Sequence, residues 1–309
     1  MNKYLIIRPK YGLCNQLLSI SKGIIIGEIT KRNVIFIGFQ IDYRNENNIC
    51  NFKDIIDIEH LKTIIKESNL NVNIDSKENL ECIKIKTDSL EKTSMIKDFI
   101  PLLENDENKN EIYLDVDNPV SCNIPYEYET ILKYININIK FTHKYIELAY
   151  YIKKNLKLEN YTCIHLRLED DSINFMKEQN KYFDFSVINE IYKSKYLNEL
   201  NYLKSLNNIN NKIYICTSLL INNNKNNDFY KEIKIKYNLL DKNDFINNND
   251  FDKCREIYAI IDYIIAQDSI YFVGSDWSSF SIFISEYHNF NQKANKLIDI
   301  YKTMMLMNE

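Results

Sequence analysis

Three polar residues, His165, Arg167 and Asp170, follow one another closely where a predicted strand ends. That strand covers Tyr161–Leu166 and is apolar enough to be buried. In an open α/β sheet, ligands bind just beyond the carboxyl ends of the strands. Arg167 would place a planar, permanently charged group there, which suits a phosphate. The segment therefore indicates a phosphorylated ligand, and a surface ion pair between Arg167 and Asp170 is the alternative.

A second polar segment follows the predicted strand 270–273. Gly274 opens a turn, and Ser278 and Ser279 stand at the start of the next predicted helix. The N–H groups of a first helical turn, with two hydroxyls, form an anion site that needs no lysine. The alternative is that Ser278 is only an N-cap. Asp262, among apolar residues of the preceding helix, would orient a sugar hydroxyl or a base edge, or else pair locally.

The first predicted turn from strand to helix holds a third candidate site. Gly12 would let the backbone turn tightly and approach a ligand closely. Asn15 would cap the following helix or hydrogen-bond a ligand at its positive end. A plain turn with an asparagine cap explains the same residues without a ligand.

Alternating strands and helices surround these three segments. A strand at 4–8, a helix at 15–31 and a strand at 33–37 form a β-α-β unit, which is the usual start of a Rossmann-like domain. The pattern from about residue 40 to residue 140 is less regular, and an amphipathic helix follows it. The sequence here predicts helices at 58–68, 95–104, 127–134 and 143–156 and a strand at 82–86.

A second α/β series runs from residue 161 to residue 287. Its strands are expected at 161–166, 212–217, 244–246 and 270–273, and its helices at 185–205, 228–237, 253–267 and 278–287. A final helix is expected from 291 to 305. We therefore predict two Rossmann-like α/β domains, 1–150 and 151–290, and a C-terminal helix in 291–309 that packs back on the first domain.

Bulk properties exclude several classes of function. The net charge of −4 gives no electrostatic footprint for nucleic acid. None of the seven cysteines forms a CxxC pair, so we expect no zinc site. The apolar runs are too short for a transmembrane segment, and Met1 leads directly into a strand rather than a signal peptide. We expect a reduced, cytoplasmic protein, with a host organelle left open.

The three polar segments together resemble motifs of the fucosyltransferase superfamily that uses GDP-fucose. This superfamily includes protein O-fucosyltransferases and α1,2- and α1,6-fucosyltransferases, and its motifs read roughly G-x-x-N, H-x-R-x-x-D and F-x-G-x-x-x-S-S-F-[ST]. The order along the chain also agrees. Here the motifs stand as Gly12-Leu-Cys-Asn15, His165-Leu-Arg167-Leu-Glu-Asp170 and Phe272-Val-Gly274-Ser-Asp-Trp-Ser278-Ser279-Phe280-Ser281.

The resemblance implies a GT-B fold, in which two Rossmann-like domains face an interdomain cleft. It implies an inverting enzyme that transfers fucose from GDP-fucose to a hydroxyl of a glycan or protein, without a metal or other cofactor. Arg167 would bind the β-phosphate and stabilise the departing GDP. Among the neighbouring carboxylates, we predict Asp170 as the general base. The implied donor-binding residues are Gly12, Asn15, His165, Asp262, Ser278, Ser279 and Phe280.

Three other functions are compatible with the sequence. A metal-dependent GT-A glycosyltransferase would use Asp115-Val-Asp117 or Asp250-Phe-Asp252 as its DxD motif, although neither follows a convincing apolar strand. The same GT-B fold could use another GDP-sugar. A catalytically inactive protein could use Arg167, Ser278 and Ser279 only to bind a nucleotide sugar.

Overall fold

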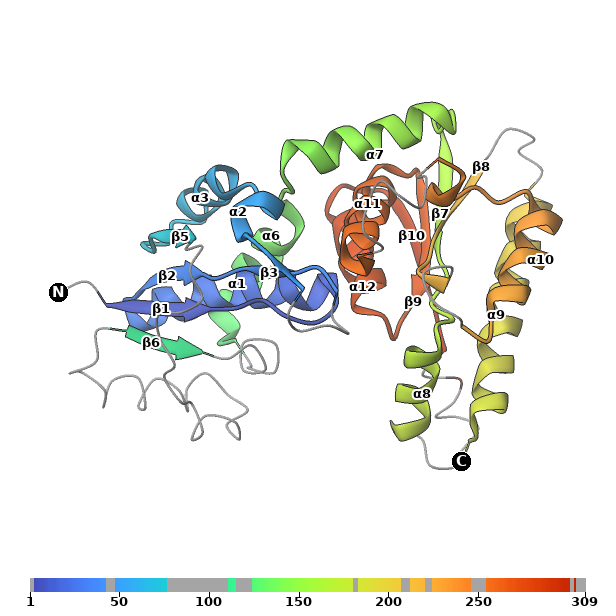
Figure 1. Cartoon of the computed structure of the whole chain (residues 1–309), viewed down its shortest axis with the longest axis horizontal. Helices are drawn as coiled ribbons and strands as arrows, with labels where there is room; N and C mark the ends of the chain where they lie inside the picture. Colours follow the sequence, from blue (N-terminus) through green and yellow to red (C-terminus); the bar gives the residue numbers. More distant parts are fainter. Residues whose placement is uncertain are drawn as a thin grey trace. The chain divides into compact units, whose positions relative to one another are not determined.

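The chain divides into two compact units, Met1–Tyr145 and Ile146–Glu309, within helix α7 (His143–Asn155) (Figure 1). The computed structural model describes residues 3–42, 48–76, 111–114, 124–179, 183–206, 212–219, 224–245, 254–300 and 303. Within these ranges, no helix is long and apolar enough to cross a membrane. The predicted strand 82–86, the predicted helix 95–104 and both DxD segments lie outside them.

The first unit is built on a parallel sheet with the strand order β5-β2-β1-β6. Strand β1 (Tyr4–Ile7) leads into α1 (Leu13–Thr30), and β2 (Asn33–Phe36) returns beside β1, which confirms the predicted β-α-β unit. The other elements of this unit are β3 (Phe39–Gln40), β4 (Ile49–Cys50), α2 (Phe52–Ile55), α3 (Ile58–Glu67), β5 (Ile74–Ser76), β6 (Glu111–Leu114), the 3-10 turn η1 (Tyr126–Tyr128) and α6 (Glu129–Asn138).

The second unit holds another parallel sheet, with the strand order β10-β9-β7-β8. Helices alternate with its strands, as the sequence predicts. Its elements are β7 (Tyr161–His165), α8 (Asp170–Gln179), α9 (Phe185–Ser205), β8 (Lys212–Cys216), α10 (Asn227–Tyr237), the 3-10 turn η3 (Lys242–Asp244), α11 (Arg255–Asp268), β9 (Tyr271–Ser275), α12 (Ser279–Phe290) and β10 (Ala294–Ile298).

Strand β7 is buried along its whole length because helices cover both faces of its sheet (Figure 1). Ile164 and Leu166 point into an apolar core formed with α8, α9 and α10. On the other face, the Tyr161 hydroxyl donates to the Ile265 carbonyl of α11, and His165 contacts α12. Ile164 and Leu166 therefore face the apolar core, while Tyr161 and His165 lie on the opposite face.

The prediction of a helix from 291 to 305 is wrong for its first part, because Ala294–Ile298 forms the edge strand β10. Helix α12 ends where Gln292 takes a left-handed conformation (φ 53°), and the Lys293 N–H donates to the His288 carbonyl. The chain then runs parallel to β9 over five residue pairs. This strand pairs the backbone groups that the edge of β9 would otherwise leave open. Of the residues that follow β10, Asp299, Ile300 and Thr303 are described.

The prediction of a strand at 244–246 is also wrong, since 242–244 forms the 3-10 turn η3. The Asp241 carboxylate accepts the Asn243 N–H, and the Asp244 carboxylate accepts the Asp241 N–H, so the two aspartates cap the turn reciprocally. Leu240 makes the bridge to β8 instead. The acidic residues therefore start a turn directly after the sheet contact.

Candidate functional site

The carboxyl ends of β7, β8 and β9 meet at one edge of the second sheet because the three strands are parallel. His165 ends β7, and the loop after β9 leads into α12. The Nδ1 atom of His165 lies 2.8 Å from Ser281 Oγ, and its ring lies 4.5 Å from that of Phe280 between centroids. The fold thus brings two of the three predicted segments into contact.

The backbone around Arg167 is held by a buried tyrosine. The Arg167 N–H donates to the Tyr196 hydroxyl over 3.1 Å, and that hydroxyl donates to the His165 carbonyl over 2.9 Å. Burial raises the pKa of Tyr196 well above its ordinary value, so the phenol stays protonated. Helix α9 therefore fixes the main chain from which the arginine side chain extends.

Two carboxylates orient the guanidinium of Arg167. Its Nη1 lies 2.9 Å from Glu169 Oε2, and its Nη2 lies 3.0 Å from Asp171 Oδ2. Burial alone would lower the pKa of Arg167, but the two carboxylates outweigh it and raise the pKa. The alternative of an ion pair with Asp170 is not the arrangement observed, since Arg167 pairs with Glu169 and Asp171 instead. Arg167 is thus a charged, oriented fork that keeps 23% of its side chain exposed.

Glu169 ties the ends of β7 and β8 together. Its Oε1 accepts the Ser218 N–H over 3.1 Å and the Ser218 hydroxyl over 2.7 Å, while Oε2 holds Arg167. Burial would raise the pKa of Glu169, but Arg167 and Arg255 outweigh it and lower the pKa to about 2. The carboxylate is therefore ionised, buried and bonded through both oxygens. These properties suit a group that positions Arg167 rather than one that accepts protons.

Asp170 begins α8 and faces a different loop. Its carboxylate accepts the Lys225 N–H at 3.2 and 3.4 Å, and its own N–H donates to Asn224 Oδ1 over 3.3 Å. The sequence did not predict α8, which places Asp170 in its first turn. Asp170 therefore holds the loop before α10 in this structure, and a role as general base stays a prediction.

His165 is buried, with 7% of its surface exposed. Burial lowers its pKa to about 3, although the nearby Glu169 acts in the opposite direction. The imidazole is therefore neutral near pH 7, and it contacts Ser281 and Phe280 as an uncharged group. It contributes no positive charge to the site, whose charge comes from arginine.

We expect His165→Gln to flatten the dependence of stability on pH. The folded pKa of about 3 lies below the ordinary value of 6.5. The unfolded chain therefore binds one more proton between these values, and the folded state loses stability as the pH falls from 6.5 towards 3. One such proton corresponds to about 1.4 kcal/mol per pH unit. Urea unfolding at several pH values measures both slopes, and equal slopes would contradict a buried neutral His165.

Helix α12 begins at Ser279 with an unusual N-cap. Ser278 occupies the cap position and is buried, but its side chain makes no capping hydrogen bond. The alternative that Ser278 is only a side-chain cap is therefore not supported, and the first-turn N–H groups keep their capacity for an anion. Gly274 serves the same region because an added Cβ would lie 2.5 Å from Ser281 Cβ. A side chain there would push Ser281 away from His165.

Asp262 lies in a buried ion pair. Its Oδ2 is 2.6 Å from Lys242 Nζ, and its Oδ1 accepts the Tyr214 hydroxyl over 2.8 Å. Lys242 also donates to the Thr217 carbonyl over 3.0 Å, which ties the pair to the end of β8. The local-pairing alternative for Asp262 is thus the arrangement observed. Contact with a donor remains a prediction.

Gly12 and Asn15 lie in the first unit, where the turn differs from its prediction. The left-handed residue is Tyr11 (φ 69°), whereas Gly12 has φ −61° and is itself the N-cap of α1. Asn15 is the third helical residue and not the cap. Gln16 Nε2 donates to the Tyr11 and Gln40 carbonyls over 2.8 and 2.7 Å, and the Gln40 N–H returns a bond of 2.9 Å to Gln16 Oε1. This glutamine pair, rather than a glycine, fixes the turn.

The sequence reasoning missed four residues of the second unit that contribute to the site. Glu169 had a detectable signal, since it follows Arg167 at the spacing of one strand face. Asp171 lies four positions after Arg167 in the same segment, so it too is close in sequence. The other two, Lys242 and Arg255, come from distant segments and carry no such signal, because only the fold brings them to the sheet edge.

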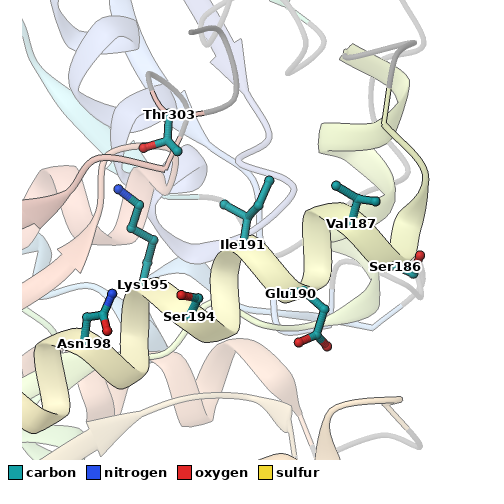
Figure 2. Close-up of a pocket in the computed structure, with 8 residues that line it drawn as sticks. All are labelled: Ser186, Val187, Glu190, Ile191, Ser194, Lys195, Asn198 and Thr303. Carbon is teal, nitrogen blue, oxygen red and sulfur yellow. The ribbon is translucent and has the colours of Figure 1, made fainter. Parts of the chain in front are cut away.

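A pocket of about 560 Å³ lies apart from this edge, along the outer face of α9 (Figure 2). It contains none of the nine predicted site residues. In Figure 2, Lys195 extends from the helix towards Thr303. The full lining is Ser186, Val187, Glu190, Ile191, Ser194, Lys195, Asn198 and Thr303. We therefore identify the candidate site by the charged side chains that meet at this sheet edge, and not by the size of a cavity.

Residues 30–291 match the family model for GDP-fucose protein O-fucosyltransferase. A comparison with curated protein sequences finds no match. The chain is similar to the crystal structure of POFUT1 without ligand, with 10% identity, a TM-score of 0.62, and coverage of 96% of this chain and 98% of that one. For POFUT1 in complex with GDP-fucose, the values are 12%, 0.60, 96% and 99%.

NodZ is similar to the chain as well. For the NodZ α-1,6-fucosyltransferase soaked with GDP-fucose, the identity is 12%, the TM-score is 0.58, and 93% of each chain is covered. Another NodZ structure names Bradyrhizobium as its source. At these identities the likeness concerns the fold, and it confirms the predicted GT-B-type α/β class.

Proposed function

The chain belongs to the GDP-fucose protein O-fucosyltransferase family and is a glycosyltransferase, and from this premise we propose its reaction. It transfers fucose from GDP-fucose to a hydroxyl of a glycan or protein acceptor. The anomeric configuration inverts, and no metal ion takes part. Residues of the second unit bind the nucleotide, and Gly12 and Asn15 of the first unit contribute to the donor site.

The oriented guanidinium of Arg167 is the observation that carries this proposal. As the bond between fucose and the β-phosphate lengthens, negative charge grows on the phosphate. A group already fixed at that place stabilises the transition state more than the ground state. Arg167 is fixed in place before the donor binds, because the Tyr196 hydroxyl accepts its backbone N–H and the Glu169 carboxylate pairs with its guanidinium. The charge that a metal ion supplies in other transferases comes here from arginine.

The uncapped start of α12 supports the same reaction. Its N–H groups and the Ser278 and Ser279 hydroxyls lie on the helix whose Ser281 contacts His165. Such a helix start binds phosphate through its dipole and its unpaired donors. Phe280 adds an aromatic surface beside His165. These groups are suited to the pyrophosphate and the nucleoside.

Release of GDP from GDP-fucose by the full chain tests this function. We expect release with GDP-fucose to exceed release with GDP-mannose or a UDP-sugar, and to be unchanged by EDTA. Addition of peptide or glycan acceptors should increase it. Preference for another GDP-sugar would reassign the donor, and loss of activity in EDTA would contradict metal independence. Thermal stabilisation by GDP without turnover would instead favour an inactive binding protein.

A further inference from the structure

Two arginines from distant parts of the second unit converge on one carboxylate oxygen. Asp171 Oδ2 lies 3.0 Å from Arg167 Nη2 and 3.4 Å from Arg255 Nη1. Arg255 is the first residue of α11, 84 positions further along the chain. A second guanidinium, that of Arg255, therefore lies close to the Nη2 atom of Arg167.

The four charged groups at this place differ in exposure. The side chain of Glu169 is 5% exposed, and those of Arg255 and Arg167 are 13% and 23% exposed. Asp171 is the most exposed, at 38%. Glu169 also accepts two hydrogen bonds from Ser218. Asp171 is thus the carboxylate that an incoming anion can displace at the lower cost.

A phosphate oxygen has the same requirements as Asp171 Oδ2. It carries negative charge, accepts several hydrogen bonds at once, and fits the fork of a guanidinium. A carboxylate that bridges two arginines therefore occupies a site that suits one oxygen of a pyrophosphate. Two guanidinium groups also match the charge of a diphosphate better than one does.

From this geometry we infer that Arg255 is a second residue that binds the donor pyrophosphate, and that Asp171 occupies its place until the donor arrives. The inference rests on the proposed function. Donor binding then exchanges an internal carboxylate for the diphosphate, while Glu169 keeps Arg167 oriented. Asp171 lowers the affinity for GDP by competition and keeps the two arginines in position in the free enzyme.

Affinities of the full chain for GDP, inorganic pyrophosphate and guanosine, measured by calorimetry, test this inference. Loss of the competing charge in Asp171→Asn should tighten GDP and pyrophosphate binding by about tenfold, and Arg255→Gln should weaken both by a similar factor. Guanosine binding should change in neither variant. General destabilisation would weaken binding in both variants. It therefore cannot explain tighter binding by Asp171→Asn together with weaker binding by Arg255→Gln.

Matched controls come from the exposed pair Asp228 and Lys231 on α10, whose side chains are 96% and 64% exposed. Asp228→Asn and Lys231→Gln make the same charge changes away from the site, and they should leave all three affinities unchanged. The inference is overturned if Asp171→Asn binds GDP no more tightly than the wild type, or if Arg255→Gln binds it no more weakly. If the two variants change pyrophosphate affinity as predicted but the protein transfers no fucose, the result supports this site and contradicts the proposed reaction. Absence of binding to both GDP and pyrophosphate would contradict both.

Discussion

Arg167→Ala is expected to reduce fucose transfer by at least two orders of magnitude. Loss of one donor that is aimed at developing charge costs about 10²–10³ in turnover. Arg167 is such a donor, because Glu169 holds its guanidinium and Tyr196 holds its backbone. Turnover of GDP-fucose at saturating donor and acceptor measures the effect. Turnover near the wild-type value in a folded variant would exclude Arg167 as the group that stabilises the leaving GDP.

The design must separate catalysis from folding, since Arg167→Ala leaves the buried Glu169 without its arginine partner. A second variant, Arg167→Ala with Glu169→Gln, removes that uncompensated charge. The amide oxygen introduced by Glu169→Gln would still accept the hydrogen bonds from Ser218. We expect this variant to recover thermal stability without recovering turnover. Arg167→Lys keeps the charge but lacks the fork, and it should retain only part of the activity.

The strand periodicity predicts more of the site than any composition argument does. Side chains alternate along a strand, so His165 is expected opposite Ile164 and Leu166, and the structure has them on opposite faces. The same alternation extended to Glu169 would have found the residue that orients Arg167. The helix after β9 is likewise predictable, because two serines before an apolar run are a local signal. The prediction that Gly274 opens the turn is wrong, since Gly274 belongs to β9 and the turn begins at Asp276.

Long-range pairs could not be predicted in this way. Asp262 was recognisable as a carboxylate in an apolar segment, but nothing in its neighbourhood identifies Lys242 as its partner. Arg255 reaches Asp171 only because α11 begins at the same sheet edge as α8. The edge strand β10 was missed for a similar reason. Its backbone follows β9, while its side-chain pattern also fits a short amphipathic helix.

Asp262→Ala is expected to destabilise the folded state by about 3–5 kcal/mol, which is the cost of breaking a buried ion pair from one side. Lys242 is 1% exposed. In Asp262→Ala its buried ammonium group would still have the Thr217 carbonyl as a hydrogen-bond acceptor, but it would lose its carboxylate partner. Lys242→Met should cost a similar amount, because it leaves the Asp262 carboxylate without its cation. Urea unfolding at pH 7.5 measures both variants, and the change should appear in the midpoint rather than in the slope.

The double variant Lys242→Met with Asp262→Leu replaces the ion pair by two apolar side chains. Its stability shows whether the pair makes a net contribution to the free energy of unfolding. Burial raises the pKa of Asp262 to about 6, despite the lowering effects of Lys242 and Tyr214. The contribution of this group is therefore full below its ordinary pKa of 3.8, and it is lost as the pH rises through 6. For Lys242, burial would lower the pKa, but Asp262 outweighs it and raises the pKa. Because the double variant removes the cost of burying both charges together with their attraction, an apolar pair should be as stable as the wild type at pH 7.5, or more stable. Strong destabilisation of the double variant would show instead that the ion pair itself holds α11 against η3.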